Sequence, residues 1–188
     1  MINKTETYAN IRKNFGSLSQ AQVEGFEAII NQFYNIGLID LRYLAYILAT
    51  VWHETAKTMQ PISEFGKGKD RDYGKRLRIN RKLYTITKNI FYGRGHTQNT
   101  WIDNYEKLTK SNNEGWDFVN NPDLLLEMKP SIWATFYAMT TGLYTGKKLS
   151  DYFSKTSNDP VGARKIINGQ DKAQKIAEYY HLFLKSIS

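Results

Sequence analysis

The chain has 188 residues, a length that suits one domain with a sizeable core, and 14% of them are aromatic. It has no cysteine, which excludes disulfides and thiolate chemistry, and no apolar run long enough to span a bilayer. The net charge is +8, and residues 67–82 hold eight basic side chains against two acids, a surplus of six. Such a surplus favours a polyanionic partner, although a solvated loop can have the same composition.

Helical patterns dominate the first third of the chain. After a polar start, Ser19 and Gln22 form a capping-box pattern, and apolar residues then recur at helical spacing as far as Gly37. Asp40 is the expected N-cap of a second helix, whose apolar positions from 41 to 52 fall on one side. Two helices joined by a short connection are therefore predicted over about 20–54.

The pattern then changes to glycine, charge and short β-prone runs between residues 61 and 91. We interpret this segment as a loop-rich insert with a small hairpin. Helical patterns return at 101–110, after 120–124, across 129–144 and over 160–185, with Gly169 as a break in the last segment. The sequence thus predicts one mainly α domain over 1–188 that carries a basic, loop-rich insert at about 61–91.

Several kinds of site are not supported by the motifs. His53 is not followed by a second histidine four residues later, and His96 and His181 have no ligand spacing, so we expect no metal. The glycine-rich stretches lack the pattern of a phosphate-binding loop, and no serine lies in a G-x-S-x-G elbow. We therefore expect no cofactor.

Two glutamates remain as candidate acid and base. Glu54 ends the predicted apolar helix, next to Thr50 and Ile47, whereas Glu64 lies among glycines and lysines. Glycoside hydrolysis needs one protonated carboxyl to donate to the leaving oxygen and one ionised carboxylate to activate water or attack carbon. Apolar surroundings favour the protonated carboxyl, and a polar loop favours the ionised carboxylate. The spacing of Glu54 and Glu64 alone does not distinguish a catalytic pair from two unrelated surface glutamates.

A motif beyond the insert sharpens this interpretation. The segment "FYGRGHTQNTWIDNYEKL" (91–108) resembles the signature of glycoside hydrolase family 19, which includes plant-type chitinases and phage endolysins. In the same order, "ILATVWHETA" (47–56) is similar to the catalytic helix of that family, "PISEFGKGKDRDYG" (61–74) to the segment with its second carboxylate, and "VGARKIINGQDKAQKIAEYY" (161–180) to its last helices. The resemblance runs from about residue 19 to 185 and implies a two-lobed, lysozyme-like fold, mainly α with some β.

The resemblance also implies roles for individual residues. Glu54 would be the general acid and Glu64 the general base of an inverting mechanism, with the Thr100 hydroxyl holding the attacking water. Arg94 would form an internal ion pair. The expected glycan contacts are His53, Tyr92, Gln98, Asn104 and Asn168.

Two positions depart from the family pattern. Asn99 stands where leucine or isoleucine is usual, so local packing is expected to differ. Lys175 stands where arginine is frequent, so an ammonium replaces a guanidinium that could form two parallel hydrogen bonds.

The absence of cysteine, the small size, the basic insert and the lack of an N-terminal signal peptide favour the endolysin branch. We then expect a monomer made in a bacterial cytoplasm that reaches the cell wall after release and cleaves β-1,4 bonds of peptidoglycan. The insert could add attraction to an anionic envelope surface, and no nucleic acid is expected as partner. The alternatives are a chitinase using the same residues and, from another class, a non-catalytic wall- or nucleic-acid-binding module.

Overall fold

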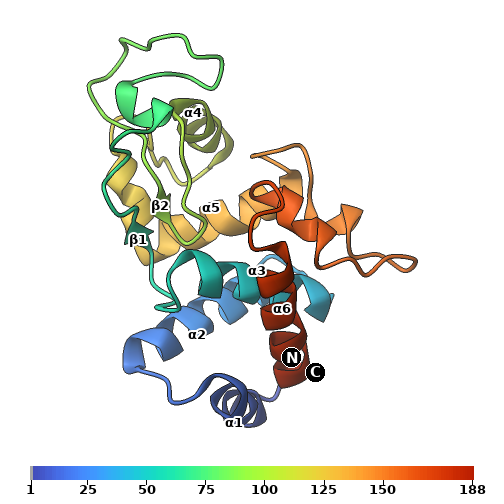
Figure 1. The fold of residues 1–188 in the computed structure, drawn as a ribbon. Coiled ribbons are helices and arrows are strands. Elements are labelled where there is room, and N and C mark those ends of the chain that lie inside the picture. Colours follow the sequence, from blue (N-terminus) through green and yellow to red (C-terminus); the bar gives the residue numbers. More distant parts are fainter. Residues whose placement is uncertain (1) are drawn as a thin grey trace.

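The computed structural model describes residues 2–188. Figure 1 shows six α-helices joined by loops, short 3-10 turns and one small sheet. The helices are α1 (Lys4–Phe15), α2 (Gln20–Asn35), α3 (Leu41–Glu54), α4 (Ile102–Ser111), α5 (Met128–Thr141) and α6 (Ala173–Ile187). The sheet pairs β1 (Ile62–Ser63) with β2 (Arg94–Gly95) in antiparallel register. The 3-10 turns are η1 (Asp72–Lys75), η2 (Pro122–Leu126), η3 (Leu149–Asp151) and η4 (Gly162–Ile166).

The caps predicted for the first helices are confirmed. Ser19 and Gln22 form a reciprocal capping box at the start of α2, and the Asp40 side chain accepts from a backbone N–H at the start of α3. The structure also contains α1, which lies in the polar start where no helix was predicted. Its N-cap is Asn3, and it buries Tyr8 and Ile11. Its apolar stripe is narrow, so its periodicity is weak in the sequence.

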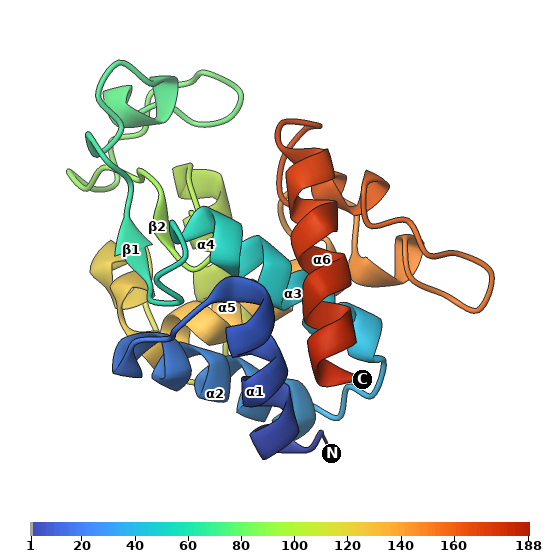
Figure 2. The same cartoon turned by 60° about the horizontal axis from the view of Figure 1, so that its bottom comes forward.

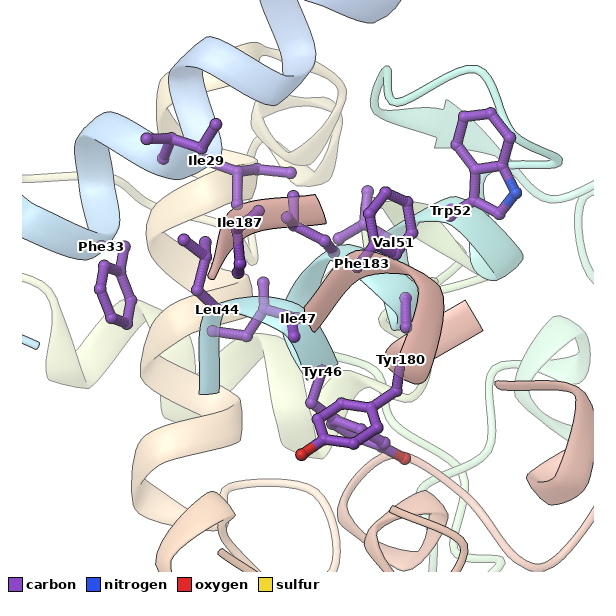
Figure 3. Packing of buried hydrophobic residues seen from close by; sticks show 14 of the residues in the cluster. Ile29, Phe33, Leu44, Tyr46, Ile47, Val51, Trp52, Tyr180, Phe183 and Ile187 are labelled. Carbon is purple, nitrogen blue, oxygen red and sulfur yellow. The ribbon is translucent and has the colours of Figure 1, made fainter. Parts of the chain in front are cut away.

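Helix α3 is the centre of the larger core (Figure 3). Every residue from 44 to 52 is buried, so the helix is covered on all sides and not along one stripe as predicted. Helices α2, α5 and α6 surround it, and Figure 3 shows residues of α2 and α6 against it. Figure 2 shows α6 beside α3, with α1 packed on α6. A helix covered this way is a rigid support for the residue at its end.

A second, smaller core lies on the other side of the molecule. It is made by side chains of α4, of the segments before and after α4, and of α5: Tyr84, Phe91, Ile102, Tyr105, Leu108, Phe118, Leu125 and Ala134. Helix α5 belongs to both cores, because Ile132 and Phe136 pack in the larger one while Ala134 packs in the smaller one. The two cores define two lobes with α5 common to both.

The loop-rich insert predicted at 61–91 is present and projects from the molecule in Figures 1 and 2. Its hairpin is marked by an antiparallel bridge between Leu77 and Leu83. Arg78 fixes this hairpin to α4 through Glu106, with N···O distances of 2.8 and 2.9 Å, and through Asp103 at 3.3 Å. Arg76 donates to backbone carbonyls inside the insert. These two arginines are therefore structural, and only part of the basic surplus is available to a partner.

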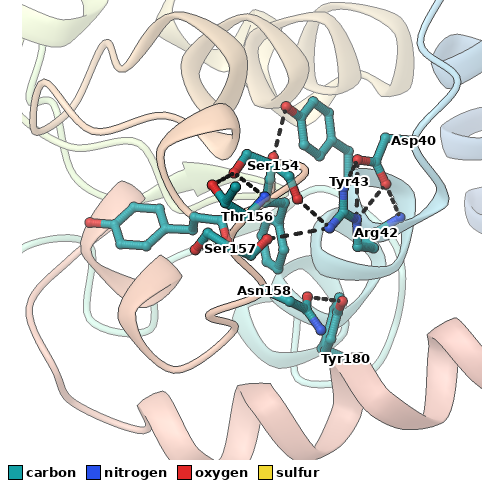
Figure 4. A network of polar contacts seen from close by, with 10 residues as sticks. Asp40, Arg42, Tyr43, Ser154, Thr156, Ser157, Asn158 and Tyr180 are labelled. Atoms are coloured by element: carbon teal, nitrogen blue, oxygen red, sulfur yellow. Dashed lines mark hydrogen bonds and ion pairs between the residues drawn. The ribbon is translucent and has the colours of Figure 1, made fainter.

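A polar network ties the loop before η4 to the start of α3 (Figure 4). The Arg42 guanidinium bonds Asp40 and donates to the carbonyl oxygens of Ser154 and Ser157, at 2.8 and 3.3 Å. Tyr180 of α6 donates to Asn158 at 2.7 Å. The chain that leads into η4 is thereby held against the central helix.

The mainly α, two-lobed fold with a small sheet agrees with the predicted fold class. Among residues 2–188, no helix combines the length and hydropathy needed to cross a membrane.

Candidate active site

A cavity of about 550 Å³ brings together residues from both lobes. Glu54 reaches it from the end of α3, Glu64 from the end of β1, and Asn168 from the segment after η4. The remaining lining comes mainly from the β2–α4 segment and the insert, and comprises Tyr73, Ile79, Gly93, Thr97, Gln98, Asn99, Thr100, Trp101, Asn104, Tyr144 and Ile167. Residues distant in the sequence thus converge on one cavity with two carboxylates.

Glu54 is positioned by the way α3 ends. The Thr55 hydroxyl donates to the Val51 carbonyl at 2.7 Å and accepts from the Met59 N–H, which closes the last turn. The Glu54 side chain is 15% exposed, and its Oε1 accepts from Nη1 of Arg164 in η4 at 2.5 Å. The uncharged surroundings expected for Glu54 are therefore wrong, because an opposite charge from the distant η4 turn touches it. The Arg164 guanidinium thus places a positive charge directly against this carboxylate.

Glu64 is held by two donors. Its Oε1 accepts from the Tyr73 hydroxyl at 2.6 Å and its Oε2 from the Gly93 N–H at 3.0 Å. The two bonds fix the orientation of the carboxylate. A Cβ at position 93 would lie 2.9 Å from Oε1 of Gln98 and 3.2 Å from the Glu64 Cβ, so a larger residue there would crowd both side chains.

Four other predicted site residues also line the cavity. Thr100 contributes its carbonyl to the Asn104 side-chain amide at 2.9 Å, and Asn104 Oδ1 is buried without a partner among residues 2–188. Gln98 uses Nε2 to bond the carbonyls of Ile62 and Gly95, both at 3.0 Å. Asn168 is exposed, and its Oδ1 accepts from the Gly169 N–H at 2.8 Å. Their proposed contacts with glycan remain predictions.

His53 and Tyr92 do not line the cavity. Tyr92 is 8% exposed, and its ring lies under the Arg94 guanidinium, with 3.6 Å from the carbon to the ring centroid. Arg94 in turn bonds Asp123 at 2.7 Å, which confirms the predicted internal ion pair. The expected glycan contact of Tyr92 stays a prediction. His53 adjoins Glu54 and is half-buried; burial lowers the pKa of its imidazole.

Several lining residues were not identified from the sequence. Tyr73 comes from the insert, and Tyr144 follows α5 and bonds Thr97 through the two hydroxyls at 2.9 Å. Trp101 has a positive φ of 66° and meets Tyr73 edge to face, with 5.6 Å between ring centroids. Strained backbone of this kind concentrates at functional sites, but only the structure reveals it. Arg164 precedes the I-I-N-G stretch, yet no spacing pattern connects it to Glu54.

Of the two positions that depart from the family pattern, Lys175 lies away from the cavity and Asn99 lies in its wall. Lys175 lies on α6, pairs with Glu178 at 2.8 Å and does not reach the cavity, so the cation beside Glu54 is Arg164. Asn99 is 2% exposed in the cavity wall, and neither atom of its side-chain amide has a partner among residues 2–188.

No three of histidine, aspartate and glutamate come together as a metal site would require within residues 2–188. The chemistry that the cavity offers is that of two carboxylates in different surroundings, one beside a guanidinium and one beside a phenol and a backbone N–H. A proton donor and an acceptor facing one cavity can catalyse acid–base hydrolysis.

The arrangement of lobes is that of the lysozyme-like α+β class. No protein-family model and no curated protein matches the sequence. Among solved structures, the crystal structure of a bacterial family 19 chitinase, reported to differ from the plant enzymes, has the same fold with a TM-score of 0.58. The match covers 96% of this chain and 93% of that chain at 17% identity. At this identity, the similarity establishes the fold.

Proposed function

We propose that this chain is a glycoside hydrolase of the endolysin type, which hydrolyses β-1,4 bonds of bacterial peptidoglycan by an inverting mechanism. The observation that supports hydrolysis is the convergence of Glu54 and Glu64 on one cavity, each with its own hydrogen-bond partners. The fold shared with a family 19 chitinase agrees with this chemistry. The preference for peptidoglycan rests on the sequence, through the lack of cysteine and the basic insert.

In the proposed mechanism, Glu64 removes a proton from water while Glu54 protonates the leaving oxygen. Tyr73 and Gly93 keep the Glu64 carboxylate oriented toward the water, and the Thr100 hydroxyl would hold that water on its other side. As the acid, Glu54 must carry a proton when the glycan is bound, while its Oε1 contacts Arg164. The same contact stabilises the carboxylate that remains after the proton has left.

Chitin is the second candidate substrate, because the matching solved structure is a chitinase. The two substrates share the β-1,4 linkage and N-acetylated sugars, and they differ in the lactyl ether and peptide of the wall polymer. Release of reducing ends should be measured on purified peptidoglycan and on chitin oligomers in parallel. Faster cleavage of chitin oligomers would replace the endolysin assignment with the chitinase one.

Catalysis by the carboxylate pair is tested with Glu54→Gln and Glu64→Gln. Both changes keep the shape of the side chain and remove the acid or the base, so hydrolysis should nearly vanish while melting curves stay close to those of the parent. Glu114→Gln, on the surface and outside the cavity, is the matched control. The product should first appear as the α-anomer by NMR, since water attacks opposite the leaving group. A β-anomer refutes inversion, and a folded, fully active Glu54→Gln refutes the hydrolase assignment. A binding module without catalysis would show no cleavage by any variant.

A further inference from the structure

Residues 79–88, at the end of the insert, expose several large apolar side chains, whereas most such side chains in the molecule are buried. We call this segment the tip. Six large hydrophobic residues are exposed in the described chain, and three of them belong to the tip: Ile79 at 52%, Leu83 at 64% and Ile86 at 62%. Ile79 also lines the cavity, whereas Leu83 and Ile86 do not. Three exposed aliphatic side chains within eight residues form an unusual patch for a water-facing loop.

The tip is also cationic. Arg81, Lys82 and Lys88 are exposed, and the chain has no acidic residue from 73 to 102. Asp103 and Glu106, the acidic residues of α4 that contact the hairpin, are already paired with Arg78. Among residues 2–188, Lys82 and Lys88 make no ion pair, and Arg81 meets Asp72 at 3.4 Å while 80% exposed. The positive charge of the tip is therefore open to a partner.

The tip is held outward by its base. The Leu77–Leu83 bridge closes the hairpin, and Arg76 donates to the carbonyls of Tyr84 and Thr87, at 3.3 and 2.7 Å. The buried Tyr84 anchors the segment through its hydroxyl, which donates to the Asn89 carbonyl at 2.8 Å. Because the backbone is fixed in this way, Leu83 and Ile86 stay exposed on either side of a buried residue.

We propose that the tip docks on a lipid surface that carries anionic head groups. Basic side chains meet the head groups, and the aliphatic side chains between them enter the boundary with the acyl chains. A soluble polyanion would use only the charges, so exposed Leu83 and Ile86 favour the lipid. The proposal is independent of the proposed function, since vesicle binding requires no glycan and no catalysis.

The test is cosedimentation of the full chain with vesicles of phosphatidylglycerol or of phosphatidylcholine. Two variants separate the contributions: Leu83→Ser with Ile86→Ser, and Arg81→Gln with Lys82→Gln and Lys88→Gln. Matched controls elsewhere on the surface are Ile39→Ser, which removes another exposed aliphatic side chain, and Lys13→Gln with Lys155→Gln and Lys185→Gln, which removes the same charge. Heparin serves as a soluble polyanion, and hydrolysis of soluble glycans as an independent readout.

The parent should bind phosphatidylglycerol vesicles and not phosphatidylcholine vesicles. Each basic side chain near an anionic surface contributes about fivefold to partitioning, so the triple charge variant should lose about a hundredfold. The apolar variant should lose about a hundredfold on vesicles and nothing on heparin. Both controls should bind like the parent. Equal vesicle binding by the parent and the apolar variant would show that only the charges of the tip bind, and would overturn the proposal. Absence of binding to phosphatidylglycerol vesicles would also overturn it.

Discussion

Removing the Tyr73 hydroxyl is the change that most directly tests how Glu64 is held. Tyr73→Phe keeps the ring against Trp101 and deletes one of the two hydrogen bonds to the carboxylate, the one of 2.6 Å. Burial, and then the bond to Glu64, raise the pKa of Tyr73 to about 12, so the phenol stays a donor at every working pH. A hydrogen bond to a charged group contributes about 1.5–3 kcal/mol, which corresponds to about ten- to a hundredfold in rate if lost in the transition state.

The expected result has two parts. Turnover of the phenylalanine variant should fall by about ten- to a hundredfold. The loss should appear in kcat more than in KM, because the deleted bond orients the proposed base. The Gly93 N–H remains, so activity should not disappear.

The assay is release of reducing ends as a function of substrate concentration, together with thermal melting. Tyr84→Phe is the matched control, because it removes a phenol of the same insert whose bond to the Asn89 carbonyl lies outside the cavity. If Tyr73→Phe keeps the parent kcat, or if Tyr84→Phe causes the same loss of kcat, the positioning role of Tyr73 is refuted.

Three further predictions concern the site and the fold. Thr100→Val keeps the side-chain shape and removes the hydroxyl that would orient water, so turnover should fall by about ten- to a thousandfold; unchanged turnover would make Thr100 structural. Arg164→Gln removes the charge beside Glu54, so turnover should fall by about tenfold or more if this contact stabilises the carboxylate left after proton transfer, and unchanged turnover would argue against that role. Burial lowers the pKa of His96 from 6.5 to about 4, and the unfolded chain therefore binds its proton first as pH falls. Stability should decrease by about 3 kcal/mol between pH 6.5 and 4, measured by denaturant unfolding, and His96→Gln should flatten that slope.

The sequence predicted the elements whose signals are local. The capping box at Ser19, the cap at Asp40 and the change of pattern after residue 61 are set by neighbouring residues, and the structure agrees with each. Helix α1 was missed because its apolar side chains are few among polar ones, and its burial depends on packing against α6, far along the chain. The complete burial of α3 likewise depends on helices that the local pattern does not reveal.

The candidate site was predictable only in part, for the same physical reason. Glu54, Glu64 and Thr100 stand in motifs with recognisable residues, and the fold brings them to one cavity. Their partners, Arg164 and Tyr73, come from turns whose positions follow from tertiary packing. Tyr92 also stands in the motif, but it lies under a guanidinium and is not among the residues that line the cavity.

Helix α5 has a consequence for dissecting the protein. Its side chains complete both the larger and the smaller core, so each lobe lacks part of its interior without the segment Met128–Thr141. A fragment that ends before this helix would leave Phe118 without the stacked ring of Trp133, and a fragment that begins with it would lack α3 and α4. We expect neither lobe to fold when it is produced alone. A circular permutant opened between α1 and α2 preserves α5 in full and offers a way to relocate the termini while both carboxylates keep their supports.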